Sequence, residues 1–362
     1  MRISFILPFA SLSGGIRVIA TYARELTQAG HEVTVISRPL RVKTSPLRTL
    51  VNKITGKARA RAREDRTTPF LDFLGERHVV LGRFRPVTPR DVPDGDAVIA
   101  TWWETAESVA QLPATKGKKF YLLQDYETFG NLPAEDVATS YTLPLHKIAV
   151  SGYIRDCVSE NHGVSDITVI PNAVDTTQFD AAPRARNTPL TVGFLYHAHP
   201  RKRADLALAA VLAAKHLVPD LRVVAFGRGW PAEEFGLPDW VDYHQSPPQA
   251  EIPKLYAACD LWLFTSDHEG FGLPLLEAMA CRTPVLATRA GAAADLIDGT
   301  NGDLLEADPE AFATKIAEVA QMSPEAWRAM SDAAYQTAHS YTWTDAAQRL
   351  VTEIQATEGI SP

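Results

Sequence analysis

The chain has 362 residues, which is too long for one ordinary hydrophobic core and is typical of two domains. Its 46% hydrophobic and 22% charged residues are ordinary for a soluble globular protein. The three cysteines, Cys157, Cys259 and Cys281, show no metal-like spacing, which argues against a zinc site or a disulfide framework and for a reducing compartment. No apolar run reaches the roughly 18 residues of a membrane span, so we expect a cytoplasmic protein.

Charge is distributed unevenly along the chain. Residues 41–66 contain nine Lys or Arg and two acids, a balance of +7, so the rest of a chain of net charge −7 carries −14. This argues against broad nucleic-acid binding but allows local contact with an anionic surface. Leu47, Leu50, Val51 and Ile54 form one apolar helical stripe in the basic segment. It is predicted either to rest on an anionic membrane, with a peripheral location, or to be a charged excursion or a helix packed on its domain.

In the first half of the chain, apolar runs predict strands and helical spacing predicts the helices between them. A strand at 2–9, a helix at 16–30 ending at Gly30 and a strand at 31–38 form a βαβ unit. Further strands are predicted at 96–103 and 118–125, then a strand and helix within 146–163, and a strand within 165–175. The long apolar runs are typical of parallel strands buried on both faces.

The same alternation starts again in the second half. Strands are predicted at 190–196, 221–229, 260–266 and 283–289, and helices at 204–218, 251–259 and 274–281. The chain is therefore predicted to be α/β, with two doubly wound Rossmann-like domains, 1–174 and 175–340, joined by a linker at 175–189. Two such domains that face each other form a cleft at the carboxyl ends of their strands, where ligands of this architecture bind.

The stretch HEGFGLPLLEAMA, residues 268–280, combines glycines with two carboxylates. Glu269 is predicted in a strand-to-helix loop and Glu277 in the first turn of the following helix. Free N–H groups of that turn attract anions, and Gly270 and Gly272 allow close approach of a ligand. Carboxylates accept hydrogen bonds from hydroxyls, so a nucleotide sugar suits the whole set. The alternative is that Glu277 stabilises the helix and Glu269 is solvated.

Two other loops favour the binding interpretation. Arg201, Lys202 and Arg203 follow the first strand of the second half, where a diphosphate would be neutralised. The alternative is a solvated basic loop. Gly14 and Gly15 lie at a strand-to-helix corner of the first half, although such turns often need glycine anyway.

Taken together, these motifs resemble a known family. EGFGLPLLEAMACRTPV with its E-x7-E spacing, the early SGG, IPNAVDTTQF and HPRKRADLALAA occur in the order of the retaining nucleotide-sugar glycosyltransferases of the GT-B fold, in the large family four group. The resemblance covers nearly the whole chain. Ala173 stands where the family has glycine in IPNGVD. QDYE after residue 123 resembles a branch that contains rhamnosyltransferases of cell-surface polysaccharide synthesis.

The resemblance implies a donor site in the second domain. Glu269 would hold hydroxyls of the transferred sugar, Glu277 the ribose diol, and Lys202 the diphosphate with help from Arg201 or Arg203. Arg203 replaces the glycine of the family's KG pair. The remaining implied donor contacts are Gly270, Phe271 and Gly272 near the sugar and phosphate, Gly14 and Gly15 from the other domain, and the strand end at Gly227 near the base.

The resemblance also implies an acceptor side in the first domain. Many members carry a His-Asp pair near the reacting sugar, and Gln124 and Asp125 stand there in this chain. Glutamine cannot act as an acid or base, although it can bond a sugar hydroxyl. The acceptor-side prediction comprises Trp102, Glu104, Asp125, Tyr126 and Glu127, and the alternative is that these residues form structural caps and turns. The predicted catalytic set is Glu269, Lys202, Gln124 and Asp125.

The implied reaction moves a hexose or deoxyhexose to a hydroxyl of a glycan or lipid-linked glycan, with the leaving phosphate helping to take the acceptor proton. No enzymic nucleophile, metal or other cofactor is expected. The C-terminal helix, within 341–362, would cross back to the first domain. Two alternatives stay open: a non-catalytic sugar-nucleotide binder, and a dinucleotide-dependent oxidoreductase. Against the second, SLSGG is not G-x-G-x-x-G, and the 31–38 strand ends without the expected acid.

Overall fold

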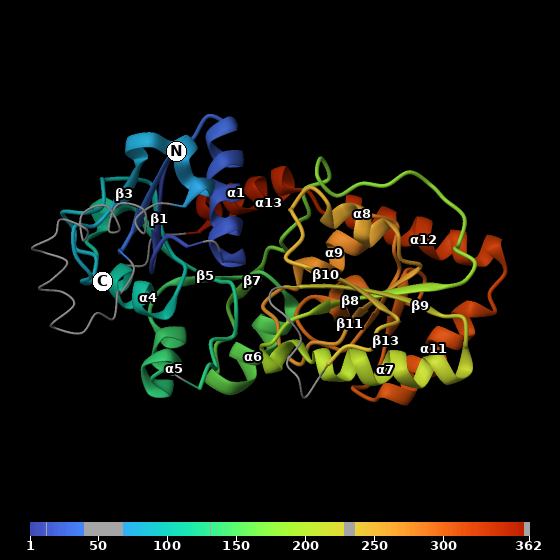
Figure 1. Ribbon diagram of the computed structural model, residues 1–362. Helices are drawn as coiled ribbons and strands as arrows, with labels where there is room; N and C mark the ends of the chain where they lie inside the picture. The colour runs from blue at the N-terminus through green and yellow to red at the C-terminus, as the bar shows by residue number, and fades with distance from the viewer. Residues whose placement is uncertain (12, 40–67, 131, 228–235, 358–362) are drawn as a thin grey trace, which may run out of the picture. The chain divides into compact units, whose positions relative to one another are not determined.

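The computed structural model describes residues 1–11, 13–39, 68–130, 132–227 and 236–357. The predicted basic helix within 41–66 lies outside these residues. The chain divides into two compact units, which are coloured from blue to red along the sequence in Figure 1. The first unit comprises 1–150, 155–170 and 343–362, and the second comprises 151–154 and 171–342.

The first unit is built on a seven-stranded parallel sheet in the order β3-β2-β1-β4-β5-β6-β7. Its strands are β1 (Arg2–Leu7), β2 (Glu32–Ser37), β3 (His78–Val80), β4 (Ala97–Ala100), β5 (Lys118–Leu123), β6 (His146–Ala149) and β7 (Ile167–Val169). Chain order reverses between β1 and β4, which pair directly with Ile3 beside Ala97. The carboxyl ends of these two strands form the topological switch point, where ligands of open parallel sheets bind.

Helices and short 3-10 turns connect the strands of the first unit. They are α1 (Gly14–Gln28), η1 (Pro69–Arg77), α4 (Trp103–Ala110), η2 (Ala114–Lys116), α5 (Ala134–Thr142), α6 (Gly152–His162) and α13 (Trp343–Ala356). The last helix, α13, packs on α1, with the Trp343 ring edge-on to Tyr22 at 5.5 Å. Lys118 also donates from Nζ to the carbonyl of Ile354 at 2.7 Å, so the end of the chain is bonded into this unit.

The second unit contains a six-stranded parallel sheet in the order β10-β9-β8-β11-β12-β13. Its strands are β8 (Thr191–Tyr196), β9 (Arg222–Gly227), β10 (Val241–Gln245), β11 (Leu261–Phe264), β12 (Val285–Ala287) and β13 (Gly302–Leu304). Its helices and 3-10 turn are η3 (Pro200–Lys202), α7 (Ala204–Leu217), α8 (Ile252–Ala257), α9 (Leu273–Ala280), α10 (Ala293–Leu296), α11 (Pro309–Ala320) and α12 (Pro324–His339). The switch point lies between β8 and β11.

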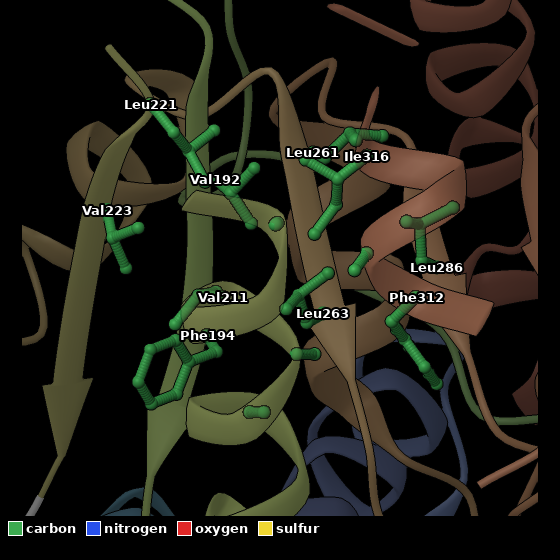
Figure 2. Close-up of a cluster of buried hydrophobic side chains, with 14 of the residues drawn as sticks. Val192, Phe194, Val211, Leu221, Val223, Leu261, Leu263, Leu286, Phe312 and Ile316 are labelled. Atoms are coloured by element: carbon green, nitrogen blue, oxygen red, sulfur yellow. The ribbon is translucent and has the colours of Figure 1, made fainter. Parts of the chain in front are cut away.

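One face of this sheet is covered by α7 and α11, which pack against each other. Figure 2 shows Val192 and Phe194 of β8 and Leu263 of β11 beside Val211 of α7 and Phe312 of α11. All five side chains are almost fully buried. Burial of such side chains contributes on the order of 1.5–3 kcal/mol each, which makes the sheet a rigid support for the loops at its edge.

The segment predicted as a linker, 175–189, is bonded to the second unit. Asp260 is fully buried, and its Oδ1 accepts hydrogen bonds from Arg184 Nη1 at 2.7 Å and from the backbone N–H of Asn187 at 2.9 Å. Arg186 donates to the carbonyl of Ala320 at 2.7 Å. Polar side chains of this segment therefore satisfy a buried carboxylate and the carbonyl end of a helix. In the structure the second unit begins at residue 171, whereas the predicted domain boundary follows residue 174.

Candidate functional site

Two loops lie side by side at the carboxyl edge of the second sheet. One follows β8 and leads through η3 into α7, and the other follows β11 and leads into α9. The N–H of Asp267 donates to the carbonyl of Arg201 at 2.9 Å, and Thr265 Oγ1 donates to the carbonyl of Arg203 at 3.0 Å. These bonds hold the loop that carries Arg201, Lys202 and Arg203 against the loop that carries Glu269, at the switch point.

Lys202 and Glu269 form an ion pair across the two loops. Glu269 Oε1 also accepts from Ser266 Oγ at 2.8 Å. The Lys202 side chain is 26% exposed and that of Glu269 13%, so the pair is only partly screened by water. A carboxylate and an ammonium so placed can accept from a ligand hydroxyl and donate to a ligand phosphate. The structure thus brings together two of the predicted catalytic residues.

Arg203 has the backbone conformation of a glycine. Its φ of 47° and ψ of 47° lie in the left-handed region, which non-glycine residues rarely adopt. Its guanidinium donates to both carboxylate oxygens of Asp205 at 3.1 Å and to Asp267 Oδ1 at 2.9 Å. The turn expected from a KG pair is therefore kept with arginine in the glycine place, and the Arg203 charge is engaged by two aspartates. A phosphate would have to compete with them.

The loop before α9 has the geometry of an anion-binding helix N-terminus. Gly272 is its N-cap at φ 88°, and no side chain of the described residues caps the helix there. A Cβ at Gly272 would lie 2.7 Å from the Phe264 ring, so this position requires glycine in both conformation and space. Gly270 and Phe271 precede it, and their carbonyls accept from Ser151 Oγ at 2.6 Å and from the N–H of Ala292 at 2.8 Å. The N–H end of α9 beside Lys202 and Glu269 favours negative charge.

Glu277 is the fifth residue of α9 and lies at the start of its second turn, rather than in the first turn as predicted. The helix begins at Leu273 and its first turn contains no acid, so the alternative role for Glu277 as a stabiliser of the helix N-terminus is wrong. Its Oε2 accepts from the hydroxyl of buried Tyr256 at 3.1 Å. Tyr256 packs edge-on against Trp262 of β11 at 4.5 Å, which fixes the orientation of the half-buried carboxylate.

Gly227 closes β9 in direct contact with β8. A Cβ at this position would lie 1.7 Å from the carbonyl oxygen of Tyr196, so no other residue fits without moving the strand. The predicted role of this strand end beside a nucleobase stays a prediction. Residues 228–235, which follow it, lie outside the described part of the chain.

Gly15 lies at the switch point of the first unit, after β1, and Gln124 lies beside it, after β5. Gly14 and Gly15 begin the first turn of α1, and within the described residues the side chain of the N-cap Ser13 makes no capping hydrogen bond. Gln124 follows β5, and a Cβ on Gly15 would lie 3.4 Å from its Oε1. That oxygen is buried and accepts no hydrogen bond within the described residues. A buried acceptor oxygen at this place can receive a hydroxyl of a ligand.

Other predicted acceptor residues are already engaged inside the first unit. Glu104 pairs with buried Arg38, whose Nε donates to the carbonyl of Pro8 at 3.1 Å. The Trp102 ring stacks on Phe129 at 6.2 Å. Arg38 was not identified from the sequence, because its strand end offers no motif. The contact partner of Glu104 is therefore a buried cation of its own unit.

Glu127 lies in the interior, where a substrate cannot reach it. The residue is 3% exposed. Its Oε1 accepts from Tyr121 at 3.2 Å, its Oε2 from the N–H of Trp103 at 3.2 Å, and its own N–H donates to the Tyr141 hydroxyl at 2.8 Å. The prediction of an acceptor contact for Glu127 was wrong, since β5, α4 and α5 surround the carboxyl. Burial raises the pKa of Glu127 to about 8, although the hydrogen bonds that its carboxyl group accepts from Trp103 and Tyr121 lower it.

Asp125 and Tyr126 lie between the buried Glu127 and Gln124, and both are partly exposed. The Tyr126 hydroxyl is 3.1 Å from His162 Nε2, and its ring stacks on Tyr141 at 5.7 Å. Burial lowers the pKa of His162. The segment 124–127 is thus held from beneath by aromatic packing, and it presents Gln124 and Asp125 at the strand end.

Among the described residues, no helix combines the length and the apolar character needed to cross a membrane.

The second unit carries the region that is similar to known families. Residues 175–337, which contain both donor-side loops, match the family model for glycosyl transferases group 1. This part of the chain is therefore similar to the group 1 glycosyltransferases.

Curated relatives show a similarity of the same kind. A D-inositol 3-phosphate glycosyltransferase of Segniliparus rotundus is 32% identical over 213 residues, which cover 52% of this chain and 47% of the relative. A GDP-mannose-dependent alpha-(1-6)-phosphatidylinositol monomannoside mannosyltransferase of Mycolicibacterium smegmatis is 28% identical over 197 residues, which cover 47% of this chain and 51% of the relative. The chain thus matches about half the length of these curated relatives.

Solved structures show the fold of the whole chain. Anabaena Alr3699/HepE in complex with UDP has a TM-score of 0.70 at 18% identity, covering 99% of this chain and 100% of that one. A sucrose-phosphate synthase of Thermosynechococcus elongatus has a TM-score of 0.67 at 17% identity, covering 98% of both chains. The prediction of a GT-B chain with two Rossmann-like α/β domains is confirmed.

Proposed function

We propose that this chain is a glycosyltransferase that transfers a hexose or deoxyhexose from a nucleoside-diphosphate sugar to a hydroxyl of a glycan or glycolipid, with retention of the anomeric configuration. The observation that carries the proposal is the Lys202–Glu269 pair beside the uncapped N-terminus of α9. Hydroxyls and phosphates are the two groups that such a site recognises. The family match and the transferase names of the relatives support the same reaction class over an oxidoreductase.

Each donor-side residue would contact the part of the donor that its chemistry suits. Glu269 would accept from hydroxyls of the transferred sugar, and Glu277, oriented by Tyr256, from the ribose diol. Lys202 would exchange its bond with Glu269 for one with the diphosphate, helped by Arg201 or Arg203. Charge on the leaving diphosphate would thereby be stabilised where it develops.

The first unit would contribute the acceptor side. Gln124 Oε1, which accepts no hydrogen bond within the described residues, would receive a hydroxyl, and Asp125 would contact the acceptor. Since Gln124 has no titratable proton, we propose that the leaving phosphate takes the acceptor proton and that no enzymic nucleophile takes part. The proposed transfer needs no metal. Activity that persists in excess chelating agent would support this, whereas loss of activity that is restored by Mg²⁺ would overturn it.

A second candidate function is a sugar-nucleotide binder without turnover. It is favoured by Gln124, because this side chain cannot exchange protons at the place where many family members carry a histidine. Turnover separates the two candidates. Tight donor binding without release of nucleoside diphosphate, across all donors and acceptors tried, would favour the binder.

The test of the proposed transfer has two stages. A thermal-shift screen over UDP-, GDP- and dTDP-sugars should raise the melting temperature only with the correct donor. Release of nucleoside diphosphate is then measured with that donor and an acceptor extract. Glu269→Gln should lower kcat/KM at least tenfold, because a neutral amide loses a charge-assisted bond of about 1.5–3 kcal/mol. The matched control is Glu310→Gln on the exposed start of α11, which should leave the rate unchanged.

For the biological setting, we propose a cytoplasmic enzyme of cell-surface polysaccharide synthesis, with rhamnose among the donor sugars to be tried. The support is the QDYE resemblance and the number and spacing of the three cysteines, which argue for a reducing compartment. Peripheral attachment to an anionic membrane through 41–66 is part of the proposal. Sedimentation with liposomes tests it, since equal binding by a variant with a charge-neutralised segment would overturn the attachment.

A further inference from the structure

The first turn of α6 contacts the donor-side loop of the second unit. Residues 151–154 are grouped with the second unit, although α6 continues into the first. Ser151 Oγ donates to the carbonyl of Gly270 at 2.6 Å. The Tyr153 hydroxyl is 3.0 Å from His268 Nδ1, with the two rings edge-on at 5.6 Å. The two contacts lie on either side of Glu269, one on each neighbouring residue.

The Ser151 hydroxyl both donates and accepts a hydrogen bond. It accepts from the N–H of Ile154 at 3.3 Å, which caps α6, and it donates its single proton to Gly270. Ser151 is fully buried, so water cannot replace either bond. A hydroxyl is the side-chain group that can make both contacts from this position, which alanine cannot do.

Gly152 adds a third attachment to the same unit. Its N–H donates to Asp295 Oδ2 at 2.8 Å, and a Cβ at this position would lie 2.6 Å from Asp295 Oδ1. Asp295 belongs to α10, just after the segment in which the N–H of Ala292 bonds the carbonyl of Phe271. The turn 151–153 is thus bonded both to the donor loop and to the helix that supports it.

The carboxylate of Glu269 is held directly by Lys202 and Ser266, which belong to the sheet edge. The backbone on either side of it depends on Ser151 and Tyr153. We propose that the turn 151–153 is a positioning element of the donor site, which holds residues 268–270 so that Glu269 meets the hydroxyls of the transferred sugar. This inference rests on the proposed function of the same loop. None of the three residues needs to touch the substrate.

The inference predicts a selective loss of sugar recognition. Ser151→Ala and Tyr153→Phe should each weaken binding of the nucleotide sugar by roughly 2- to 10-fold, the effect of one lost hydrogen bond. Binding of the corresponding nucleoside diphosphate should change by less than about twofold, because it lacks the hydroxyls that Glu269 would meet. Ser151→Thr keeps the hydroxyl and should restore sugar binding. The loss should appear in the KM for the donor more than in kcat.

The measurement is calorimetric titration of the full chain with the nucleotide sugar selected by thermal shift and with its nucleoside diphosphate. The matched control is Ser323→Ala, since Ser323 caps α12 by accepting from the N–H of Ala326 at 3.1 Å and, in the part of the chain that the structure describes, makes no bond to the donor loop. It removes a serine cap and should leave both affinities unchanged. Where Ser151→Ala fails to fold, Tyr153→Phe removes only a partly exposed hydroxyl and decides the question.

The outcomes separate the two claims. If the unaltered chain binds no nucleotide sugar, the proposed function fails, and the positioning role fails with it. If the unaltered chain binds one and both variants bind it with unchanged affinity, the positioning role alone is overturned. Equal weakening of nucleotide sugar and nucleoside diphosphate would also overturn it, because that pattern reports general damage to the domain.

Discussion

The buried carboxyl of Glu127 should make the stability of the first unit fall as pH rises through neutrality. The side chain is 3% exposed, and burial raises its pKa to about 8 from an ordinary value of 4.5. The nearby carboxylates of Asp125 and Glu104 act in the same direction, while bonds from Tyr121 and the Trp103 N–H oppose it. Glu127→Gln replaces the carboxyl with a neutral group of the same shape.

The sign of the effect follows from where the proton is bound. Between about pH 4.5 and pH 8 the folded chain keeps the Glu127 proton and the unfolded chain releases it, so the free energy of unfolding decreases as pH rises. At about 1.4 kcal/mol per pH unit, the loss over this window is on the order of 4 kcal/mol. The glutamine variant has no proton to release there. It should match the unaltered chain near the lower limit and exceed it by several kcal/mol near the upper one.

Urea unfolding at a series of pH values across this window measures the difference. Hydrogen exchange of peptides from β5 assigns the transition to the first unit, because two units need not unfold together. The control is Glu160→Gln, an exposed residue of α6, which should keep the pH dependence of the unaltered chain. Identical pH slopes for the unaltered chain and Glu127→Gln would refute the reasoning, since the carboxyl would then be ionised in the folded state.

Three further substitutions test the second unit by thermal unfolding. Arg203→Gly should shift the melting temperature little. It relieves about 1–2 kcal/mol of left-handed backbone strain, which offsets the loss of two exposed ion pairs worth about 0–1 kcal/mol each. A drop of many degrees would contradict this. Gly227→Ala should destabilise by about 1–3 kcal/mol or more, since its Cβ would meet the carbonyl of Tyr196, and unchanged stability would show that β8 and β9 can separate freely. Asp260→Ala should cost about 3–5 kcal/mol by leaving Arg184 without its buried partner, and a cost below about 1 kcal/mol would disprove that this bond holds the 175–189 segment.

Most strands of both sheets could be predicted because they are apolar runs buried on both faces, although β13 was not among the predicted strands. Prediction was weaker where local contacts override the pattern. The strand predicted at 96–103 ends at Ala100, and α4 begins at Trp103 because Thr105 Oγ1 accepts from the N–H groups of Thr101 and Trp102 at 3.0 Å. Within η1, Gly75 at φ 55° breaks the helical path, so no regular period marks it or the three-residue β3 that follows.

The candidate site could be predicted to the extent that it follows from parallel-sheet topology. Loops after neighbouring strands meet at one edge, and Lys202 and Glu269 accordingly form a pair. What the sequence does not show is which side chains face inward. Glu127 is buried because Tyr121 and Tyr141 converge on it from separate elements. Ser151 was missed because its partner carbonyl lies 119 residues away.

The placement of the carboxyl groups constrains the chemistry of the proposed transfer. Glu269 accepts from an ammonium and a hydroxyl, and Glu277 accepts from Tyr256, so both carboxylates act as acceptors and would receive hydrogen bonds from the donor in the proposed reaction. Glu127 holds a proton near neutral pH but is enclosed by its own unit. Gln124, at the strand end, has no titratable side-chain proton. In the proposed reaction these residues therefore bind and orient, and the leaving diphosphate, with its charge stabilised by the basic loop, is the group left to accept the acceptor proton.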